Sequence, residues 1–103
     1  MRGIVEKVGK RYTLSILKLL RTTGRPMKFS EIQEMLGTAG TISRRLRELY
    51  NLNLISKETR PEEVGRPTYY VLTKKGIKLL EMLDQIEKWV SQNLPENNPV
   101  NEE

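Results

Sequence analysis

Two neighbouring stretches decide the fold, and the first of them, residues 38–50, reads TAGTISRRLRELY. Ile42, Leu46 and Leu49 recur at the i, i+4 and i+7 spacing of one helical face, so they predict a helix whose apolar stripe meets a core. The residues on the opposite face are small, polar or cationic. They are Thr41, Ser43, Arg44 and Arg47. Such a face suits the major groove of duplex DNA, where side chains reach the edges of the bases.

The second stretch, residues 58–76, reads ETRPEEVGRPTYYVLTKKG and predicts a β-hairpin. Tyr70 and Leu72 alternate with their neighbours at a period of two, as in a half-buried strand. The loop before them contains two prolines and a glycine, which interrupt regular pairing. Arg60 and Arg66 on this loop predict a basic hairpin. A helix followed by such a hairpin predicts an α+β fold, mostly α: a winged helix-turn-helix with a two-stranded wing.

Charge is divided unevenly along the chain. Residues 1–78 hold 17 Lys and Arg against 7 Asp and Glu, whereas residues 79–103 hold 1 against 6. A surplus of cations attracts polyanions such as nucleic acids. We therefore expect the first three quarters of the chain to bind DNA and the last quarter to have another role.

Composition excludes several classes of protein. The chain has no Cys and no His, so it lacks disulfides, thiolate and imidazole metal ligands and the commonest general base. No nucleophile–base pair exists, and we expect no metal, no cofactor and no enzymatic activity. The longest apolar run is far below the ~18 residues of a membrane span. No apolar stretch follows Met1 to suggest a signal peptide, so a cytoplasmic protein is expected.

Two shorter helices are predicted ahead of the first stretch. One covers residues 12–21 and ends at a Gly- and Pro-containing turn. The other runs over residues 30–36, where Ser30 and Gln33 fit a capping box in which each side chain bonds the other's backbone amide. After the third helix, Asn53 stands at a position that favours a left-handed backbone, which Asn tolerates.

A final helix is predicted over residues 74–93, and it is longer than so small a domain needs. Its apolar stripe is too wide for one contact and has the spacing of paired helices, which predicts a dimer. The alternative is that the helix merely covers the domain's own core. The expected interface, including an N-terminal arm, consists of Ile4, Val8, Leu79, Met82, Leu83, Ile86, Trp89 and Val90. The winged domain would then span residues 1–93, and residues 94–103, LPENNPVNEE, form a disordered acidic tail.

Five segments of the chain resemble, in their order and spacing, the HxlR-type winged helix-turn-helix transcriptional regulators. They are GKRYTLSILKLL (residues 9–20), KFSEI (28–32), ISRRLRELYNLNLI (42–55), YVLT (70–73) with Gly76, and IEKW (86–89). The match covers roughly residues 8–90, and the whole string is far more specific than any piece. The wing segment GRPTYY (65–70) is also similar to the wings of PadR-like and MarR-like regulators.

The resemblance implies a prokaryotic homodimeric repressor or activator whose N-terminal and last helices form the dimer. Three departures from the family's pattern stand out. Members commonly carry a Cys near the N-terminus for redox or electrophile sensing, and this chain has none, which excludes thiol sensing. Tyr12 stands where the family usually has Trp, and Asn53 where it usually has Gly.

The residues expected to contact DNA lie on the third helix, on the wing and at the starts of two other helices. They are Lys28, Thr41, Ser43, Arg44, Arg45, Arg47, Arg60, Arg66 and Lys75. Arg44 and Arg47 are candidates for base contacts, with ordinary solvated charge as the alternative. Arg45 points toward the flank of the core, so a phosphate or an intramolecular contact is expected. Arg66 is expected at the minor groove, and the two lysines at phosphates.

Two functions fit these features. The first is a sequence-specific regulator of transcription that binds double-stranded DNA as a homodimer, with the third helix in the major groove and the wing at the minor groove. The alternative is a winged-helix protein–protein interaction module in a transcription or other nucleic-acid assembly, because fold alone does not decide function. The cations of residues 1–78 favour the first. No pattern in the sequence marks a pocket for a small-molecule effector.

Overall fold

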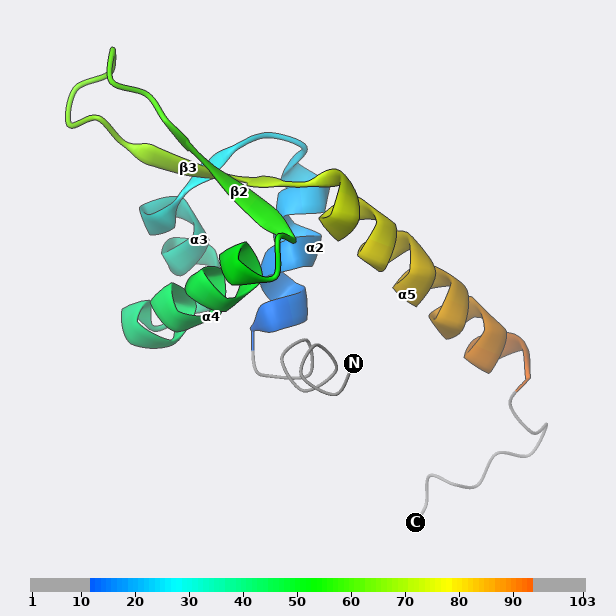
Figure 1. Ribbon diagram of the computed structural model, residues 1–103. Coiled ribbons are helices and arrows are strands. Elements are labelled where there is room, and N and C mark those ends of the chain that lie inside the picture. The colour runs from blue at the N-terminus through cyan, green and yellow to red at the C-terminus, as the bar shows by residue number, and fades with distance from the viewer. Residues whose placement is uncertain (1–11, 94–103) are drawn as a thin grey trace.

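The computed structural model describes residues 12–93, which form four helices and a three-stranded antiparallel sheet (Figure 1). In chain order the elements are α2 (Thr13–Thr23), β1 (Met27–Lys28), α3 (Phe29–Leu36), α4 (Ala39–Asn51), β2 (Ile55–Thr59), β3 (Thr68–Leu72) and α5 (Lys74–Gln92). This is the winged helix-turn-helix that the sequence predicts. The predicted N-terminal arm with Ile4 and Val8, and the predicted acidic tail, lie outside the described residues.

The core lies where α2, α3 and α4 meet the base of the wing. The three apolar residues predicted on the inner face of α4 are all buried. The rest of the buried cluster comes from the neighbouring elements and consists of Ile16, Leu17, Leu20, Met27, Ile32, Leu54, Ile55 and Leu80. Because full burial of one such aliphatic side chain contributes about 1.5–3 kcal/mol, this cluster is the main source of stability.

The sheet has the strand order β1–β3–β2, and both pairings are antiparallel. The hairpin of β2 and β3 agrees with the prediction. Strand β1 is an addition to it, because a strand of two residues is too short to show alternation. After Ile55 every residue of β2 is exposed, so the hairpin leaves the core soon after it begins. In Figure 1 the wing and α5 project from opposite sides of the core.

Helix α3 begins one residue earlier than predicted, and the expected capping box between Ser30 and Gln33 is wrong. The helix starts at Phe29, and the Glu31 carboxylate accepts a hydrogen bond of 2.9 Å from the backbone amide of Lys28. This bond lowers the pKa of Glu31, since it stabilises the charged form. The cap therefore uses an acidic residue in the first turn, where the helix dipole also favours negative charge.

The turn between α4 and β2 is packed tightly against the first turn of α5. Asn53 has a left-handed backbone with φ of 65°, as the sequence predicts. A Cβ atom at Gly76 would stand 2.2 Å from the carbonyl oxygen of Leu54, a distance that real Cβ atoms do not tolerate. Thr73 caps α5 through a 3.0 Å bond from the Gly76 amide, and its hydroxyl donates to the carbonyl of Asn53 at 2.7 Å. Only glycine fits at position 76 without moving the two helices apart.

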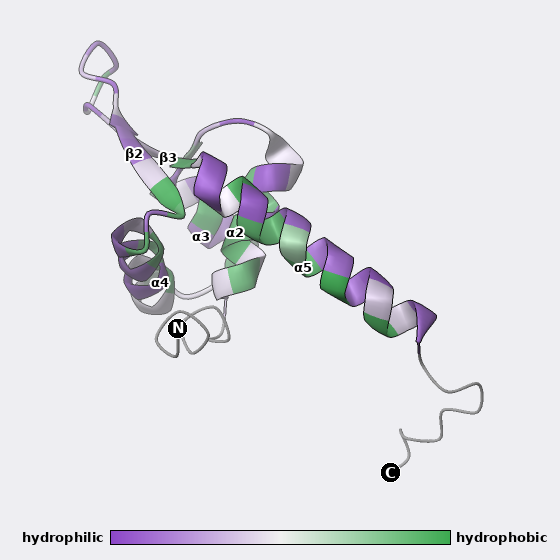
Figure 2. Cartoon of the chain, turned by 45° about the vertical axis from the view of Figure 1, so that its right-hand side comes forward, coloured by the Kyte–Doolittle hydropathy of each residue, from purple (hydrophilic) through white to green (hydrophobic). Residues whose placement is uncertain are grey.

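Helix α5 leaves the hydrophobic core after its second turn. Gly76 and Leu80 are its only fully buried residues, and Leu79, expected at a dimer interface, packs on the domain's own core. Beyond them, Figure 2 shows hydrophobic residues along the part of α5 that projects away from the other elements. Trp89 is 64% exposed. The alternative that α5 merely covers its own core therefore fails for its C-terminal half. Among the helices of residues 12–93, none combines the length and apolarity needed to cross a membrane.

Gly76→Ala should lower the free energy of unfolding by about 1–3 kcal/mol, because the added methyl group overpacks the contact with Leu54. Urea denaturation measures the change. Gly40→Ala is the matched control: a Cβ at Gly40 in α4 would meet no atom within 4 Å beyond its chain neighbours and its own helix backbone, so stability should be unchanged or slightly raised. A Gly76→Ala protein as stable as the wild type would contradict close packing between α5 and the turn after α4.

Candidate nucleic-acid interface

The outer face of α4 presents two arginines to solvent. Ser43, Arg44 and Arg47 are exposed and Thr41 is half-buried, while the opposite side of the helix is held in the core. Neither Arg44 nor Arg47 makes a hydrogen bond or ion pair with any other residue of the range 12–93. All the hydrogen-bond donors of these two guanidinium groups are therefore available to an external partner. A guanidinium can form bidentate hydrogen bonds with a phosphate or with the edge of a guanine.

Arg45 is not part of this face. Only 6% of the residue is exposed, and its guanidinium donates to the Glu48 carboxylate at 2.9 Å, one helical turn away. Of the two contacts expected for Arg45, the structure therefore contains the intramolecular one. The expectation that Arg45 contacts DNA is corrected, because its charge is already neutralised inside the fold.

Arg60, the first arginine of the wing, makes its contacts within the wing. Arg60 pairs with Glu58 at 3.3 Å and with Glu63 at 3.6 Å, and its guanidinium lies over the Tyr69 ring at 4.0 Å. The Tyr69 hydroxyl in turn donates to Glu63 at 2.9 Å, and this bond raises the pKa of Tyr69. These contacts tie the two strands together across the base of the loop, so Arg60 stiffens the wing.

The expectation of a basic hairpin is also corrected. Residues 55–72 hold three cations and three carboxylates, because the cations at 57, 60 and 66 are matched by glutamates at 58, 62 and 63. One of these cations lies at the tip: Arg66 is exposed, with φ of 47°, beside a fully exposed Val64. No other residue between 12 and 93 bonds the Arg66 guanidinium. The wing therefore presents one arginine at its tip rather than a basic surface.

The two lysines expected at phosphates differ in their surroundings. The Lys75 ammonium donates to the carbonyl of Leu52 at 2.9 Å, so it joins the start of α5 to the end of α4. Sequence reasoning missed this contact, which spans 23 positions and leaves no local pattern. Lys28 is half-buried at the start of α3, and its backbone amide serves the helix cap. Its ammonium makes no hydrogen bond or close ion pair within residues 12–93, although its charge contributes to the lowered pKa of Glu31.

Helix α5 is joined to α2 by charge. Arg21 donates to Asp84 at 2.7 Å, which lowers the pKa of that carboxyl, and Lys18 lies 3.6 Å from Glu87. These exposed pairs each contribute little to stability. On the other side of α5 the expected interface residues Met82, Ile86, Trp89 and Val90 are exposed and Leu83 is half-buried. In the described range 12–93, no three His, Cys, Asp or Glu side chains gather closely enough to hold a metal ion.

The comparisons with known proteins agree with this arrangement. A model of the HxlR-like helix-turn-helix family matches residues 7–98. An uncharacterised protein of Methanocaldococcus jannaschii is 36% identical over 95 residues, which cover 90% of this chain and 78% of that protein. The solved structure of the reduced form of the transcriptional regulator YodB from B. subtilis superposes with a TM-score of 0.76 and 26% identity, covering 90% of each chain.

A more distant structure shares the fold. A mutant of S. aureus MepR bound to an oligodeoxyribonucleotide superposes with a TM-score of 0.68 at 24% identity, covering 93% of this chain and 76% of that one. The family match spans nearly the whole chain and includes α4, the wing and α5. The chain belongs to the HxlR-like helix-turn-helix family.

Proposed function

We propose that this protein is a sequence-specific transcriptional regulator that binds double-stranded DNA as a homodimer. The observation that carries the proposal is the outer face of α4, where Arg44 and Arg47 have no partner among residues 12–93. Other arginines of the domain, such as Arg45 and Arg60, are neutralised by glutamates. Because Arg45 and Arg60 are paired while Arg44 and Arg47 are not, the attraction for a polyanion is concentrated on the outer face of α4.

Each part of the interface has a separate role. Arg44 and Arg47 read base edges in the major groove, with Ser43 beside them. Arg66 at the tip of the wing enters the minor groove, whose negative potential is greatest where A·T pairs narrow it. Lys28 contacts a phosphate, which fixes the position of the protein without selecting a sequence. Two proteins of the same fold, one a transcriptional regulator and the other bound to an oligodeoxyribonucleotide in its structure, support this assignment.

The homodimer rests on the exposed apolar part of α5. Ile86 and Trp89 are more than half exposed on a helix whose own domain does not cover them. Two copies that bury this face against each other follow two-fold symmetry, so both recognition helices meet the same duplex about one helical turn apart. The operator is then a pseudo-palindrome. A protein–protein interaction module would lack duplex binding at low salt, which separates the two functions.

Arg44→Ala and Arg47→Ala should each reduce discrimination between operator and random DNA by about 1–3 kcal/mol, because the hydrogen bonds from the arginine to a base edge are lost. Lys28→Ala should weaken binding to all sequences alike. Lys78→Ala, on the exposed side of α5, is the control and should change neither. Fluorescence anisotropy with a fragment selected from genomic DNA measures these affinities. Equal losses on operator and random DNA for both arginine variants would show that α4 does not read sequence.

Trp89→Ala should raise the dissociation constant of the dimer by at least about 30-fold, since truncation of one central aromatic anchor costs about 2 kcal/mol or more and both copies lose theirs. DNA binding should weaken with it, because one half-site binds poorly. Sedimentation equilibrium measures the dimer, and Lys88→Ala, the adjacent residue, controls for disturbance of the helix. A Trp89→Ala protein that remains as dimeric as the wild type would remove α5 from the interface.

A further inference from the structure

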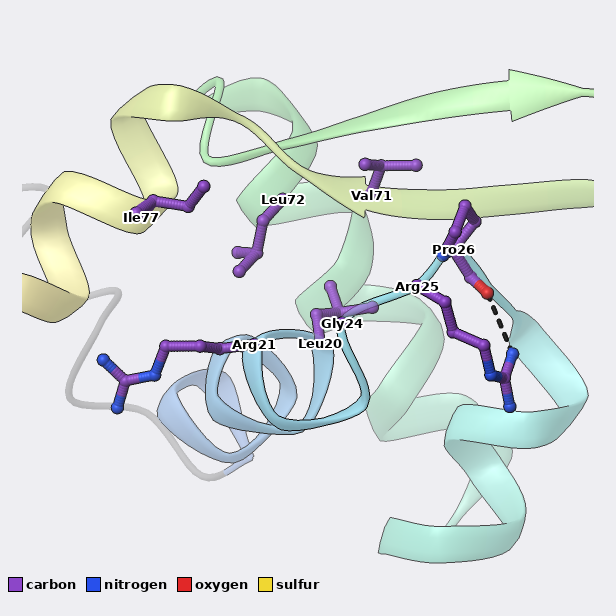
Figure 3. Close-up of a pocket in the computed structure, with 8 residues that line it drawn as sticks. All are labelled: Leu20, Arg21, Gly24, Arg25, Pro26, Val71, Leu72 and Ile77. Carbon is purple, nitrogen blue, oxygen red and sulfur yellow. Dashed lines mark hydrogen bonds between the residues drawn. The ribbon is translucent and has the colours of Figure 1, made fainter.

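A cavity of about 300 Å³ lies between the end of α2, the end of β3 and the first turn of α5 (Figure 3). This volume is at the lower end of the range of about 300–1,000 Å³ that holds small ligands. The cavity is lined by Leu20, Arg21, Gly24, Arg25, Pro26, Val71, Leu72 and Ile77. Its walls are therefore aliphatic, and the arginines contribute their apolar stems.

The charged residues in the lining of the cavity are two arginines, and the carboxylates that pair with them lie just outside the lining. Figure 3 shows the guanidinium groups of Arg21 and Arg25 at its two ends, and no acidic residue is part of the lining. Arg21 is held by Asp84 of α5, and Arg25 donates to Glu31 at 3.3 Å and to a backbone carbonyl. Both ion pairs are exposed to solvent and therefore weak. A carboxylate or sulfonate on a ligand can replace Glu31 as the partner of Arg25 at little cost in free energy, because the existing ion pair is weak.

The wall of the cavity is mechanically connected to α4. Leu72 and Ile77 flank the short segment 73–76, in which Thr73 and Lys75 bond the carbonyls at the end of α4 and in the turn after it. The Thr73 amide adds a 3.2 Å bond to the carbonyl of Leu54. These bonds give a displacement of Leu72 and Ile77 away from α2 a direct route to the C-terminal end of α4.

We propose that this cavity is an effector site for a small amphipathic organic anion, an aromatic or aliphatic body with one carboxylate or sulfonate. Its occupation shifts segment 73–76, and Lys75 transmits the shift to α4, which lowers operator affinity. Lys75 is thereby a positioning residue rather than a DNA contact. The coupling rests on the proposed DNA-binding function, whereas the site itself does not.

Binding is tested on the full chain without DNA. The probe is 8-anilinonaphthalene-1-sulfonate, and N-phenyl-1-naphthylamine is its uncharged counterpart. The Arg21→Gln/Arg25→Gln protein should bind the sulfonate about tenfold more weakly, as expected for the loss of one charge-assisted contact, and the neutral probe unchanged. Ile77→Glu, at a position 41% exposed, should weaken both probes. Lys18→Gln is the matched control, because Lys18 also pairs with α5 but does not line the cavity.

If Ile77→Glu leaves both probes bound as in the wild type while Trp89→Ala releases them, the probes occupy the apolar face of α5 and the proposed site is overturned. The site is also overturned if the sulfonate does not bind, as when the second copy of a dimer fills the cavity. Thermal unfolding followed by circular dichroism verifies that each variant is folded. These results do not depend on DNA, so they stand even if duplex binding fails.

Coupling is tested by operator affinity with and without saturating sulfonate, using a red-emitting label on the DNA. The wild type should lose about fivefold or more in affinity, the lower range of allosteric coupling. Lys75→Met should bind the probe normally and lose the effect, and Lys75→Arg, which keeps a donor for Leu52, should restore it. Probe binding that leaves wild-type operator affinity unchanged would overturn the coupling, as would a full effect in Lys75→Met.

Discussion

The contact between Gly76 and the carbonyl of Leu54 is the constraint on which the rest of the arrangement depends. It brings the first turn of α5 against the turn that ends α4, at a distance where no side chain fits. Thr73 and Lys75 then bond the carbonyls of Asn53 and Leu52. This contact sets where α5 begins relative to α4, and the packing of Leu79 and Leu80 and the ion pairs with α2 then hold its direction.

Partnered and unpartnered charges distinguish the structural arginines from those that we propose bind DNA. Arg45 and Arg60 have glutamate partners and hold the helix and the wing in shape. Arg44, Arg47 and Arg66 have none in residues 12–93, and all three are exposed. The net charge of a segment does not reveal this difference, since the hairpin is neutral overall. Partner assignment, rather than the count of cations, identifies the surface that a polyanion would meet.

Local sequence patterns predict much of the fold. The features that they do not predict depend on contacts between residues far apart in the chain. The stripe of Ile42, Leu46 and Leu49 and the left-handed Asn53 follow from spacing and residue type, and both are found in the structure. Strand β1 has only two residues, so its pairing with β3 leaves no periodic signal.

The candidate site is less predictable from the sequence than the fold. Helical periodicity places the outer face of α4 correctly, because it depends only on residues within a few turns. Arg60 was expected to contact DNA, yet its position is set by contacts with Glu58, Glu63 and Tyr69 that form only when the hairpin closes. Lys75 finds its carbonyl 23 positions away. The lining of the cavity comes from three separated segments, and no single stretch of sequence contains it.

Methylation interference with dimethyl sulfate tests the central claim most directly, because the reagent modifies guanine N7 in the major groove and adenine N3 in the minor groove. On a fragment selected from genomic DNA, two α4 helices predict interference at guanine N7 in two clusters about 10–10.5 base pairs apart. The wing tips predict interference at adenine N3 in the flanks. A single N7 cluster, or interference confined to the minor groove, would contradict a symmetric dimer that reads the major groove through α4.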